Sequence, residues 1–299
     1  KNHPESKVVV FDKFRNDELF PSGNPTSLGH FKNLIGFRGE VISGDINSER
    51  DLESLRKYEF DYIFHQAAIS DTTVSDQELM IKTNTNAFKN LLNLAVESNA
   101  NMIYASSAGT YGNSKAPNSV GLGEVPENVY GFSKLSMDNL AYSYMIKYPK
   151  LSIVGLRYFN VYGHNEYYKG RTASMILQLG IQAIKNKKIR LFKFGEQQRD
   201  FVYIDDVVQA NIKAMNPLSS GVYNVGSGKA RSFNDIVANL KKHLGEFEVE
   251  YIENPYTFYQ THTEADIKST TEHLGYEPKF SLEDGIEQYI QEIRSYAQF

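Results

Sequence analysis

The sequence predicts an α/β fold, with a doubly wound parallel-sheet domain and a smaller α/β lobe. Through the first half of the chain, short apolar runs bounded by polar residues alternate with longer segments of helical periodicity. Continuous apolar runs are typical of parallel strands buried on both faces. Their alternation with helices indicates repeated strand–helix–strand units. We expect the first domain to span residues 1–165 and the lobe residues 166–299, with segments near 195–228 returning to the first domain.

The strands and helices of the first half follow from these patterns. Strands are expected at residues 8–11, 62–65, 102–105 and 152–156. An apolar stripe from Met80 to Ala95 predicts one helix, and a second stripe from Met137 to Tyr148 predicts another. Pro149 should end the second helix, because proline cannot continue the hydrogen-bond ladder.

The second half is less regular, and its helix starts carry the clearest signals. A helix is expected at residues 173–186 and a strand at 189–194. Ser232-x-x-Asp235 and Ser281-x-x-Asp284 have the spacing of capping boxes, which predicts helices running through residues 236–244 and 286–293. The Asp205–Asp206 pair suggests a metal site, but we favour a helix N-cap.

Composition excludes several classes of function. The 299 residues carry a net charge of −4, so there is no basic stripe with which to neutralise nucleic-acid phosphates. The chain has no cysteine, which excludes disulfides, cysteine-based zinc sites and thiol catalysis and fits a reducing compartment. No apolar run approaches the roughly 20 residues of a membrane helix, and no signal-peptide pattern is present. We expect no metal site.

The start of the chain has no glycine-rich turn. A dinucleotide-binding fold begins with a strand, a glycine-rich turn and a helix, and no such turn precedes Val8. The strand ending at Asp12 therefore has the character of a second strand. We expect either that a unit of roughly 20–30 residues precedes it in the protein or that the protein binds no dinucleotide.

Tyr130-x3-Lys134, downstream of the strand that ends at Ser107, predicts a redox core. Hydride transfer from an alcohol needs a group that takes the hydroxyl proton. A lysine one helical turn from a tyrosine is expected to lower the pKa of the phenol, which is ordinarily about 10. Ser107 would hold the substrate oxygen. The alternative is a buried serine beside two structural helix residues.

Further candidates follow the strands. Asp12 would accept from the adenosine ribose of NAD, whereas Lys13 and Arg15 could bind the additional phosphate of NADP. Asp45 suits the adenine end or a plain loop. The small residues of the segment from Gln66 to Ser70 would let the backbone lie close along a cofactor. In this region His65 is assigned no role, and Asn84 is expected to bond buried backbone.

Two basic segments complete the candidates. Arg199 could clamp a substrate diphosphate. Lys169 and Arg171 flank a glycine and form a plausible ligand-binding loop, although each could be an ordinary surface residue.

These motifs resemble those of the extended short-chain dehydrogenase/reductase family of nucleotide-sugar enzymes, whose first domain has the Rossmann fold. The matching segments are Ser107 with its small neighbours, Tyr130-x3-Lys134, Arg157–Gly163, Arg199–Tyr203 and Tyr223–Gly226. A narrower resemblance is to the ADP-heptose 6-epimerases of that family. It is carried by the segments Phe64–Thr73, Lys169–Ser174 and Tyr259-x4-Glu264-Ala265-Asp266.

The narrower resemblance implies an isomerase that inverts C6 of ADP-D-glycero-D-manno-heptose by oxidation and re-reduction. It implies NADP as the cofactor, with NAD possible, a cytoplasmic homopentamer and a place in lipopolysaccharide heptose synthesis. Tyr130 and Lys169 would each serve one orientation of the sugar, with Lys134 and Ser107 assisting. The cofactor positions would be Asp12, Lys13, His30, Lys32, Asp45, Gln66, Ala67, Ala68, Ile69, Ser70, Asn84, Lys134, Val161 and Lys169. The substrate positions would be Ser107, Asn160, Arg171, Gln178, Phe192, Arg199 and Tyr259.

Two other functions stay open. A UDP-sugar 4-epimerase of the same fold would rely on Tyr130 alone, so Lys169 would be a bystander. A non-catalytic nucleotide-sugar or redox-sensing module is the remaining class. A 4,6-dehydratase is disfavoured, because Ala108 and Gly109 follow Ser107 where that chemistry needs an Asp–Glu pair.

Overall fold

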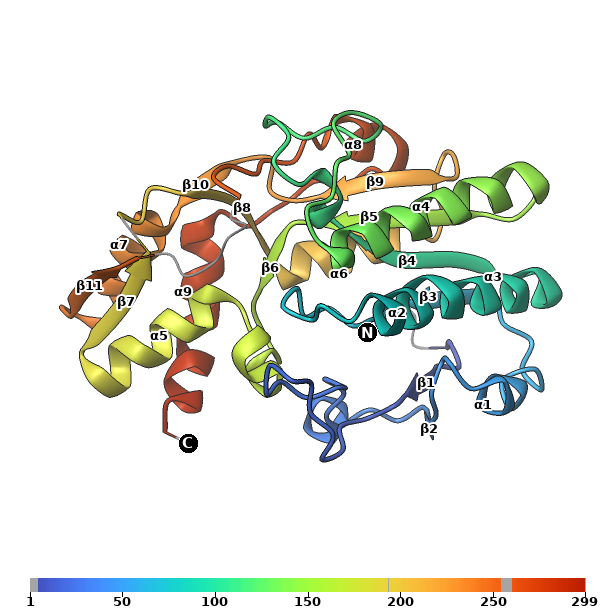
Figure 1. Cartoon of the computed structure of the whole chain (residues 1–299), viewed down its shortest axis with the longest axis horizontal. Helices are drawn as coiled ribbons and strands as arrows, with labels where there is room; N and C mark the ends of the chain where they lie inside the picture. The colour runs from blue at the N-terminus through green and yellow to red at the C-terminus, as the bar shows by residue number, and fades with distance from the viewer. Residues whose placement is uncertain (1–4, 193, 254–259, 299) are drawn as a thin grey trace.

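The structure, a computed structural model, describes residues 5–192, 194–253 and 260–298. Parallel strands and their connecting helices dominate the chain, as the sequence predicts (Figure 1). The strands are β1 (Val9–Asp12), β2 (Glu40–Ser43), β3 (Tyr62–His65), β4 (Asn101–Ser107), β5 (Ile153–Tyr158), β6 (Asn160–Tyr162), β7 (Lys188–Phe192), β8 (Gln198–Tyr203), β9 (Gly221–Val225), β10 (Ala230–Ser232) and β11 (Glu248–Ile252).

The helices alternate with these strands. The α-helices are α1 (Glu49–Glu53), α2 (Gln77–Met80), α3 (Ala87–Ser98), α4 (Val129–Lys147), α5 (Met175–Asn186), α6 (Ile204–Lys213), α7 (Phe233–Leu244), α8 (Lys268–Leu274) and α9 (Leu282–Tyr296). The 3₁₀ turns are η1 (Phe31–Leu34), η3 (Ala108–Tyr111) and η4 (Tyr167–Thr172), and η2 (Ile81–Asn86) is a π-helix.

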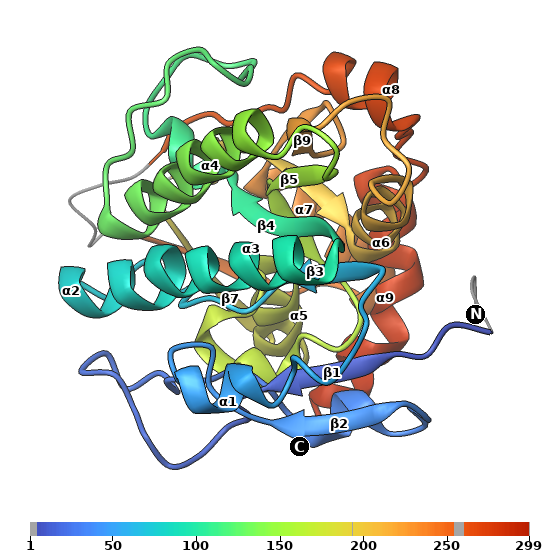
Figure 2. The same cartoon turned by 90° about the vertical axis from the view of Figure 1, so that its right-hand side faces the viewer.

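The main sheet has the strand order β3–β4–β5–β9, and all its pairings are parallel. Met102 and Tyr104 of β4 face the helices α3 and α4, whereas Ile103 faces α6 and α8. Figure 2 shows these two helical layers on opposite faces of the sheet. The alternation explains why the strand runs are continuously apolar, since both faces are covered.

The N-terminal strands form a separate parallel pair, β1–β2. Figures 1 and 2 place this pair below β3, apart from the main sheet. Val8 and Val41 in this region are nearly half exposed. This part of the molecule is therefore much less deeply packed than the main sheet.

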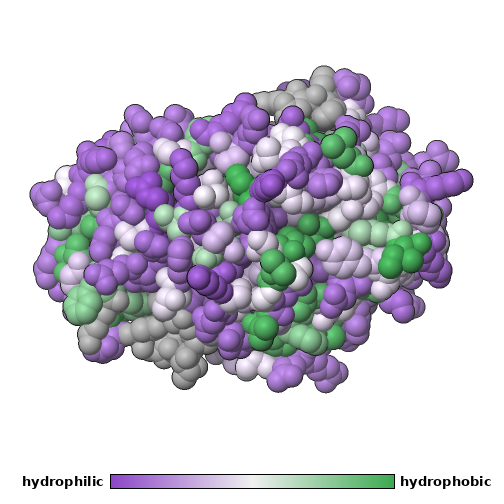
Figure 3. All heavy atoms as spheres, turned by 90° about the horizontal axis from the view of Figure 1, so that it is seen from above, coloured by the Kyte–Doolittle hydropathy of each residue, from purple (hydrophilic) through white to green (hydrophobic). Residues whose placement is uncertain are grey.

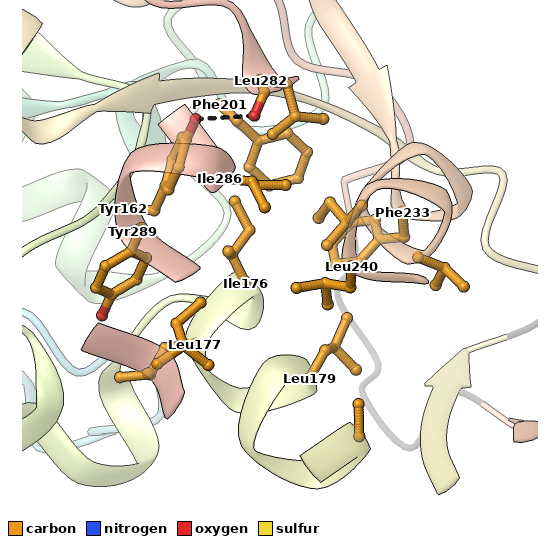
Figure 4. Close-up of a cluster of buried hydrophobic side chains, with 14 of the residues drawn as sticks. Tyr162, Ile176, Leu177, Leu179, Phe201, Phe233, Leu240, Leu282, Ile286 and Tyr289 are labelled. Carbon is orange, nitrogen blue, oxygen red and sulfur yellow. Dashed lines mark hydrogen bonds between the residues drawn. The ribbon is translucent and has the colours of Figure 1, made fainter. Parts of the chain in front are cut away.

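The second half contains two smaller sheets and a second core. β10–β8–β6 pairs β8 antiparallel to β10 and parallel to β6, and β7 pairs parallel with β11. Helices α5, α7 and α9 pack together over these strands, with Ile176, Leu240 and Ile286 fully buried between them (Figure 4). β9 returns from this half of the sequence to pair with β5.

The predicted helix starts and ends can be compared directly. Both capping boxes are present: Ser232 accepts from the Asp235 backbone amide at 3.1 Å, and Ser281 from that of Asp284 at 3.1 Å. α4 ends at Lys147, two residues before Pro149. The predicted strand at 189–194 ends earlier, at Phe192.

The surface is mainly hydrophilic with separate hydrophobic groups, as the view from above shows (Figure 3). No helix of the described residues is both long enough and apolar enough to cross a membrane. Large exposed apolar side chains include Leu122 and Val125 in the loop before α4, and Phe132 and Ile146 on α4 itself.

Candidate active site

Ser107 and Tyr130 are brought together where β4 ends and α4 begins. The Ser107 hydroxyl caps η3 by accepting the Gly109 amide at 3.0 Å, and Asn128 caps α4 by accepting the Gly131 amide at 2.8 Å. A Cβ atom placed on Gly109 would lie 3.3 Å from the Ser107 Oγ and 3.5 Å from the Tyr130 ring. The serine hydroxyl lies close enough to the phenol to lower its pKa. Because Gly109 has no side chain, it does not separate the serine hydroxyl from the tyrosine ring.

Lys134 is buried one turn further along α4. Its Nζ donates to the carbonyl of Ala105 at 2.7 Å and lies 6.0 Å from the centre of the Tyr130 ring. Burial lowers the pKa of Lys134 to about 8, against the opposing effect of the Asp138 charge. The ammonium is therefore directed to the end of β4, beside the phenol.

The structure does not show the expected lowering of the Tyr130 pKa by Lys134. Burial raises the pKa of the Tyr130 phenol, and the nearby Ser107 hydroxyl offsets only part of that rise. The reason is that the Lys134 ammonium bonds the Ala105 carbonyl, while the phenol is desolvated. At neutral pH the phenol is thus protonated and can donate.

Asn84 joins the redox core to the loop after β3, as predicted. Its side chain accepts from the Ile69 amide at 2.8 Å and donates to the Ile69 carbonyl at 3.0 Å and the Ser133 hydroxyl at 2.9 Å. Asn84 is fully buried in the π-helical turn η2, which the apolar stripe did not predict. π-turns are frequent at functional sites, because the widened turn redirects a side chain.

The segment after β3 lies partly at the surface. Gln66, Ala67 and Ser70 are exposed, whereas Ile69 packs into a small core with Phe20. The Gln66 amide donates to the Asn211 side chain at 3.2 Å. Ala68 is half-buried between them.

His65, which precedes this segment, is a packed residue. It stacks on Phe88 with ring centres 5.4 Å apart. Burial and the nearby Lys134 charge lower the pKa of His65 to about 3, so the ring is neutral. This packed environment agrees with the prediction, which assigned no role to His65.

The candidates at the end of β1 form an ion-paired turn. Asp12 accepts the Phe14 amide at 2.6 Å, and Lys13 pairs with Asp45 at 3.3 Å. Asp45 also accepts the Asn47 amide at 2.8 Å, and these hydrogen bonds, together with the Lys13 charge, lower the pKa of Asp45 despite its partial burial. Lys13 and Asp45 are thus neighbours, as a shared ligand role requires.

His30 and Lys32 contact the loop that carries Lys169. The His30 ring stacks on Tyr168 with centres 3.7 Å apart and planes 3° from parallel, and Lys32 lies over the same ring at 5.6 Å. Arg15 donates to the Tyr168 carbonyl. His30, Lys32 and Arg15 therefore meet the Lys169 loop through a single tyrosine, a contact with no local signal in the sequence.

Lys169 lies on η4, whose chain reverses at Gly170 with φ +59°. Glu166 holds the base of this loop, accepting the Ser174 amide at 2.6 Å and its hydroxyl at 2.7 Å. Lys169 is half-buried. Within the described residues its ammonium has no hydrogen bond or ion pair, and none joins it to Tyr130.

The expected substrate residues are spread around the second half. Asn160 is exposed at the start of β6 and is followed by the half-buried Val161, whereas Arg171 is exposed on the η4 loop. The Gln178 amide donates to the carbonyls of Arg171 at 3.2 Å and Ala173 at 2.7 Å, so it braces that loop. Phe192 is half-buried at the end of β7.

Arg199 and Tyr259 complete the set. Arg199 is buried in β8, and its guanidinium donates to the carbonyls of Gln198 at 2.8 Å and Gln260 at 2.5 Å. It thus reaches the chain that immediately follows residues 254–259. Tyr259 lies outside the described residues.

The predicted N-cap role of Asp205 and Asp206 is wrong. Tyr203 is the N-cap of α6, and the two aspartates lie in its first turn. Asp206 instead accepts the backbone amides of Lys279 at 2.8 Å and Phe280 at 3.1 Å, which ties α6 to the chain before α9. Long-range contacts of this kind leave no trace in a local sequence pattern.

Asp138, which is not among the predicted site residues, lies directly behind the core. Asp138 is fully buried on α4 and binds side chains of β4 and β5. Its position, four residues after Lys134 and eight after Tyr130, was the available signal.

Comparison with known proteins agrees with this arrangement. The model of the NAD dependent epimerase/dehydratase family matches residues 2–226. The chain belongs to this family. A curated relative from Brachyspira hyodysenteriae, an ADP-L-glycero-D-manno-heptose-6-epimerase, is 35% identical over 286 residues, covering 92% of this chain and 89% of the relative.

Solved structures of the family have the same fold. The Helicobacter pylori ADP-L-glycero-D-manno-heptose-6-epimerase is 57% identical with a TM-score of 0.91, over 99% of this chain and 90% of that chain. The Thermotoga maritima UDP-glucose 4-epimerase is 26% identical with a TM-score of 0.84, over 98% of this chain and 93% of that chain. The expected Rossmann-type α/β fold is thereby confirmed.

Proposed function

We propose that the protein epimerises ADP-D-glycero-D-manno-heptose at C6, giving ADP-L-glycero-D-manno-heptose. The observation that carries this is the Ser107–Tyr130–Lys134 core, assembled in a chain that is 57% identical to the H. pylori heptose epimerase. The proposed cofactor is NADP, although NAD would support the same chemistry. A nicotinamide cofactor would accept a hydride from C6 and return it to the opposite face.

Tyr130 would exchange the proton of the C6 oxygen. Its phenol is held beside Ser107, whose hydroxyl can hold the same oxygen through a second hydrogen bond. Because burial raises the pKa of the phenol, a positive charge has to assist its deprotonation. Lys134 is the nearby cation on α4, and its pKa near 8 leaves it largely protonated at neutral pH.

Lys169 would act as the second acid/base. An epimerase that presents both faces of a carbon meets the oxygen in two positions, and a single phenol fixed on a helix reaches one of them best. Lys169 lies on a loop, half-buried and without a protein partner among the described residues, so its ammonium is free to bind a substrate. This two-group mechanism also explains why the loop is braced at Glu166 and Gln178.

The residues present fit a nicotinamide dinucleotide. Among the described residues Lys134 donates one hydrogen bond, to the Ala105 carbonyl, which leaves donors for ribose hydroxyls. Asp12 at the end of β1 would bind the adenosine ribose, and the ion pair of Lys13 with Asp45 follows it. The positive charges of Lys13, Arg15 and Lys32 favour an additional phosphate and therefore NADP over NAD. His30, Asn84, Val161 and Gln66–Ser70 would complete this site.

The substrate would extend from the core into the second half of the chain. We assign the sugar and ADP contacts to Asn160, Arg171, Gln178, Phe192, Arg199 and Tyr259, and the domain boundary to residues 165 and 166. A homopentamer in the cytoplasm, acting in lipopolysaccharide heptose synthesis, completes the proposal. No nucleic acid or membrane partner is proposed.

The test is conversion of ADP-D-glycero-D-manno-heptose, with the two C6 epimers separated by chromatography. The full-length protein, supplied with NADP or with NAD in parallel, should give a mixture of both epimers. UDP-glucose is the matched competitor, because the T. maritima 4-epimerase has the same fold. Turnover of UDP-glucose without turnover of the heptose would replace our proposal with a 4-epimerase. If neither sugar reacts while cofactor binds, the proposed activity is contradicted.

A further inference from the structure

A buried carboxylate lies directly behind the proposed redox core. Tyr130, Lys134 and Asp138 follow one another at four-residue spacing on α4, so they share one face of the helix. That face lies along β4 and β5 (Figure 2). Asp138 is completely inaccessible to solvent. An isolated carboxylate at such a position would be costly, so its partners define what it does.

The first partners of Asp138 belong to the last residues of β4. The hydroxyls of Tyr104 and Ser106 donate to its two carboxylate oxygens at 2.8 and 2.9 Å. These residues flank Ala105, whose carbonyl accepts the Lys134 ammonium at 2.7 Å. Three hydrogen bonds therefore fix the register of α4 against β4, immediately before Ser107.

The second partner is Arg157 of β5, which is also fully buried. Its guanidinium contacts Asp138 through Nε at 2.9 Å and Nη2 at 2.8 Å, and its Nη1 pairs with Glu124. The ring of Tyr111 lies 5.0 Å from the guanidinium carbon. Burial raises the pKa of Asp138, and Arg157 with the two hydroxyls opposes that rise. The phenol of Tyr142 is a further titratable group near this carboxylate.

The charges that act on Lys134 are few. On α4, the Asp138 carboxylate favours the ammonium, and the ring of Tyr130 lies nearby. From β3, His65 faces Lys134, but its ring is neutral. From β4, the contact is the Ala105 carbonyl. Asp138 is thus the anion that compensates for the desolvation of Lys134.

We infer that Asp138 is a positioning residue for the redox core: its hydrogen bonds hold α4 in register with the end of β4, and its carboxylate lies one helical turn from Lys134, behind the ammonium that bonds Ala105. The effect on turnover rests on the proposed function, whereas the effect on Lys134 does not. Arg157 supports this role, because its positive charge keeps the Asp138 carboxylate ionised.

The test is a direct titration of Lys134 in Asp138→Asn. Lysine carrying ¹³C at Cε and ¹⁵N at Nζ gives one signal per side chain, and Lys134→Arg assigns the signal of Lys134. In the wild type we expect its midpoint near pH 8. In Asp138→Asn the midpoint should fall by about one pH unit or more, a tenfold smaller ratio of protonated to neutral Lys134 at a given pH. The alkaline limb of turnover should move to lower pH by the same amount.

Two matched variants separate charge from packing. Tyr104→Phe and Ser106→Ala each remove one hydrogen bond to Asp138 and leave its charge, so stability should fall while the midpoint of Lys134 stays near the wild-type value. If Asp138→Asn does not fold, Asp138→Asn/Arg157→Gln keeps the buried pair uncharged and should still lower the midpoint, because the Asp138 charge acts on Lys134 most strongly.

An unmoved Lys134 midpoint in the charge-removing variant would overturn the inference, as would an equal shift in Tyr104→Phe. The titration needs neither substrate nor cofactor. If the proposed epimerisation is not observed, the titration still tests the role of Asp138. If the titration contradicts that role, the proposed epimerisation is not affected.

Discussion

The two groups proposed to move protons are held in opposite ways. Tyr130 lies on a nineteen-residue helix, packed against two strands and backed by the Asp138–Arg157 pair. Lys169 lies on a six-residue 3₁₀ turn with a chain reversal at Gly170 and only partial burial. The first arrangement fixes a side chain through a continuous hydrogen-bonded scaffold. The second fixes a loop only at a few points.

The contrast shows how one site can combine a rigid and an adjustable group. The η4 loop is anchored at its base by Glu166, on one side by Tyr167 stacked on Tyr296 at 4.4 Å, and on the other by Tyr168 on His30. None of these contacts involves the Lys169 ammonium itself. A loop amine can therefore follow a sugar that turns, whereas the phenol cannot.

The largest effect is expected at the rigid group. Tyr130→Phe should lower turnover of the heptose by about 10³-fold or more, because the phenol carries the proton of the reacting oxygen. The free energy of unfolding should change by no more than about 1 kcal/mol. Steady-state turnover and urea unfolding measure both. Tyr144→Phe, which removes from the same helix a phenol hydroxyl that donates to Asn93 of α3, away from the predicted site residues, should turn over at the wild-type rate. A Tyr130→Phe enzyme within tenfold of wild type would contradict the assignment.

The next largest effect on turnover is expected at Lys169, the adjustable group. Lys169→Ala should lower turnover by about 10²-fold, since general acid–base groups typically contribute 10²–10⁴-fold. Lys185→Ala, at the exposed end of α5, is the matched control and should have no effect. Near-normal turnover by Lys169→Ala would remove the two-group mechanism and favour a one-tyrosine epimerase.

A smaller effect is expected when the base of the loop is loosened. In Glu166→Gln, an amide replaces a carboxylate that accepts the Ser174 amide and hydroxyl, which should destabilise the loop by about 2 kcal/mol. We expect turnover to fall by about tenfold and proteolytic cleavage near Lys169 to accelerate. Glu287→Gln, on the exposed face of α9, serves as the control. Equal cleavage rates in the two variants would show that Glu166 does not restrain the loop.

The smallest effect is expected at the side anchor. Tyr168→Leu removes the stack on His30, worth about 1 kcal/mol. Turnover should fall about fivefold, and cofactor affinity should fall with it, because His30 and Lys32 lose the ring between them. Isothermal titration with NADP measures the affinity. An unchanged affinity would separate this aromatic contact from the cofactor site.

The helix and strand order, and much of the core, were predictable from the sequence. The apolar runs at β3, β4 and β5 and the capping boxes at Ser232 and Ser281 are local patterns, and the structure has all of them. Ser107, Tyr130 and Lys134 could be selected together because Ser107 ends a strand, whereas Tyr130 and Lys134 share one face of a helix downstream of it. Asn84 could be selected because a polar residue interrupted an apolar stripe.

Other features depended on contacts between distant segments. The π-turn at Asn84, the amides held by Asp206 and the stacking of His30 on Tyr168 have no local signature. The same holds for the state of Tyr130: helix spacing places Lys134 one turn away, but the pKa of the phenol depends on how deeply it is buried and on where the ammonium bonds.

The sequence by itself determined which helices and strands form and which candidate residues they present, because periodicity, caps and strand runs act over a few neighbouring positions. Only the tertiary structure decided which of these residues meet and with what protonation. Burial and electrostatic interactions depend on distance in space, and here those distances join β4, α4 and β5 around Asp138, and the N-terminal half to the Lys169 loop around Tyr168.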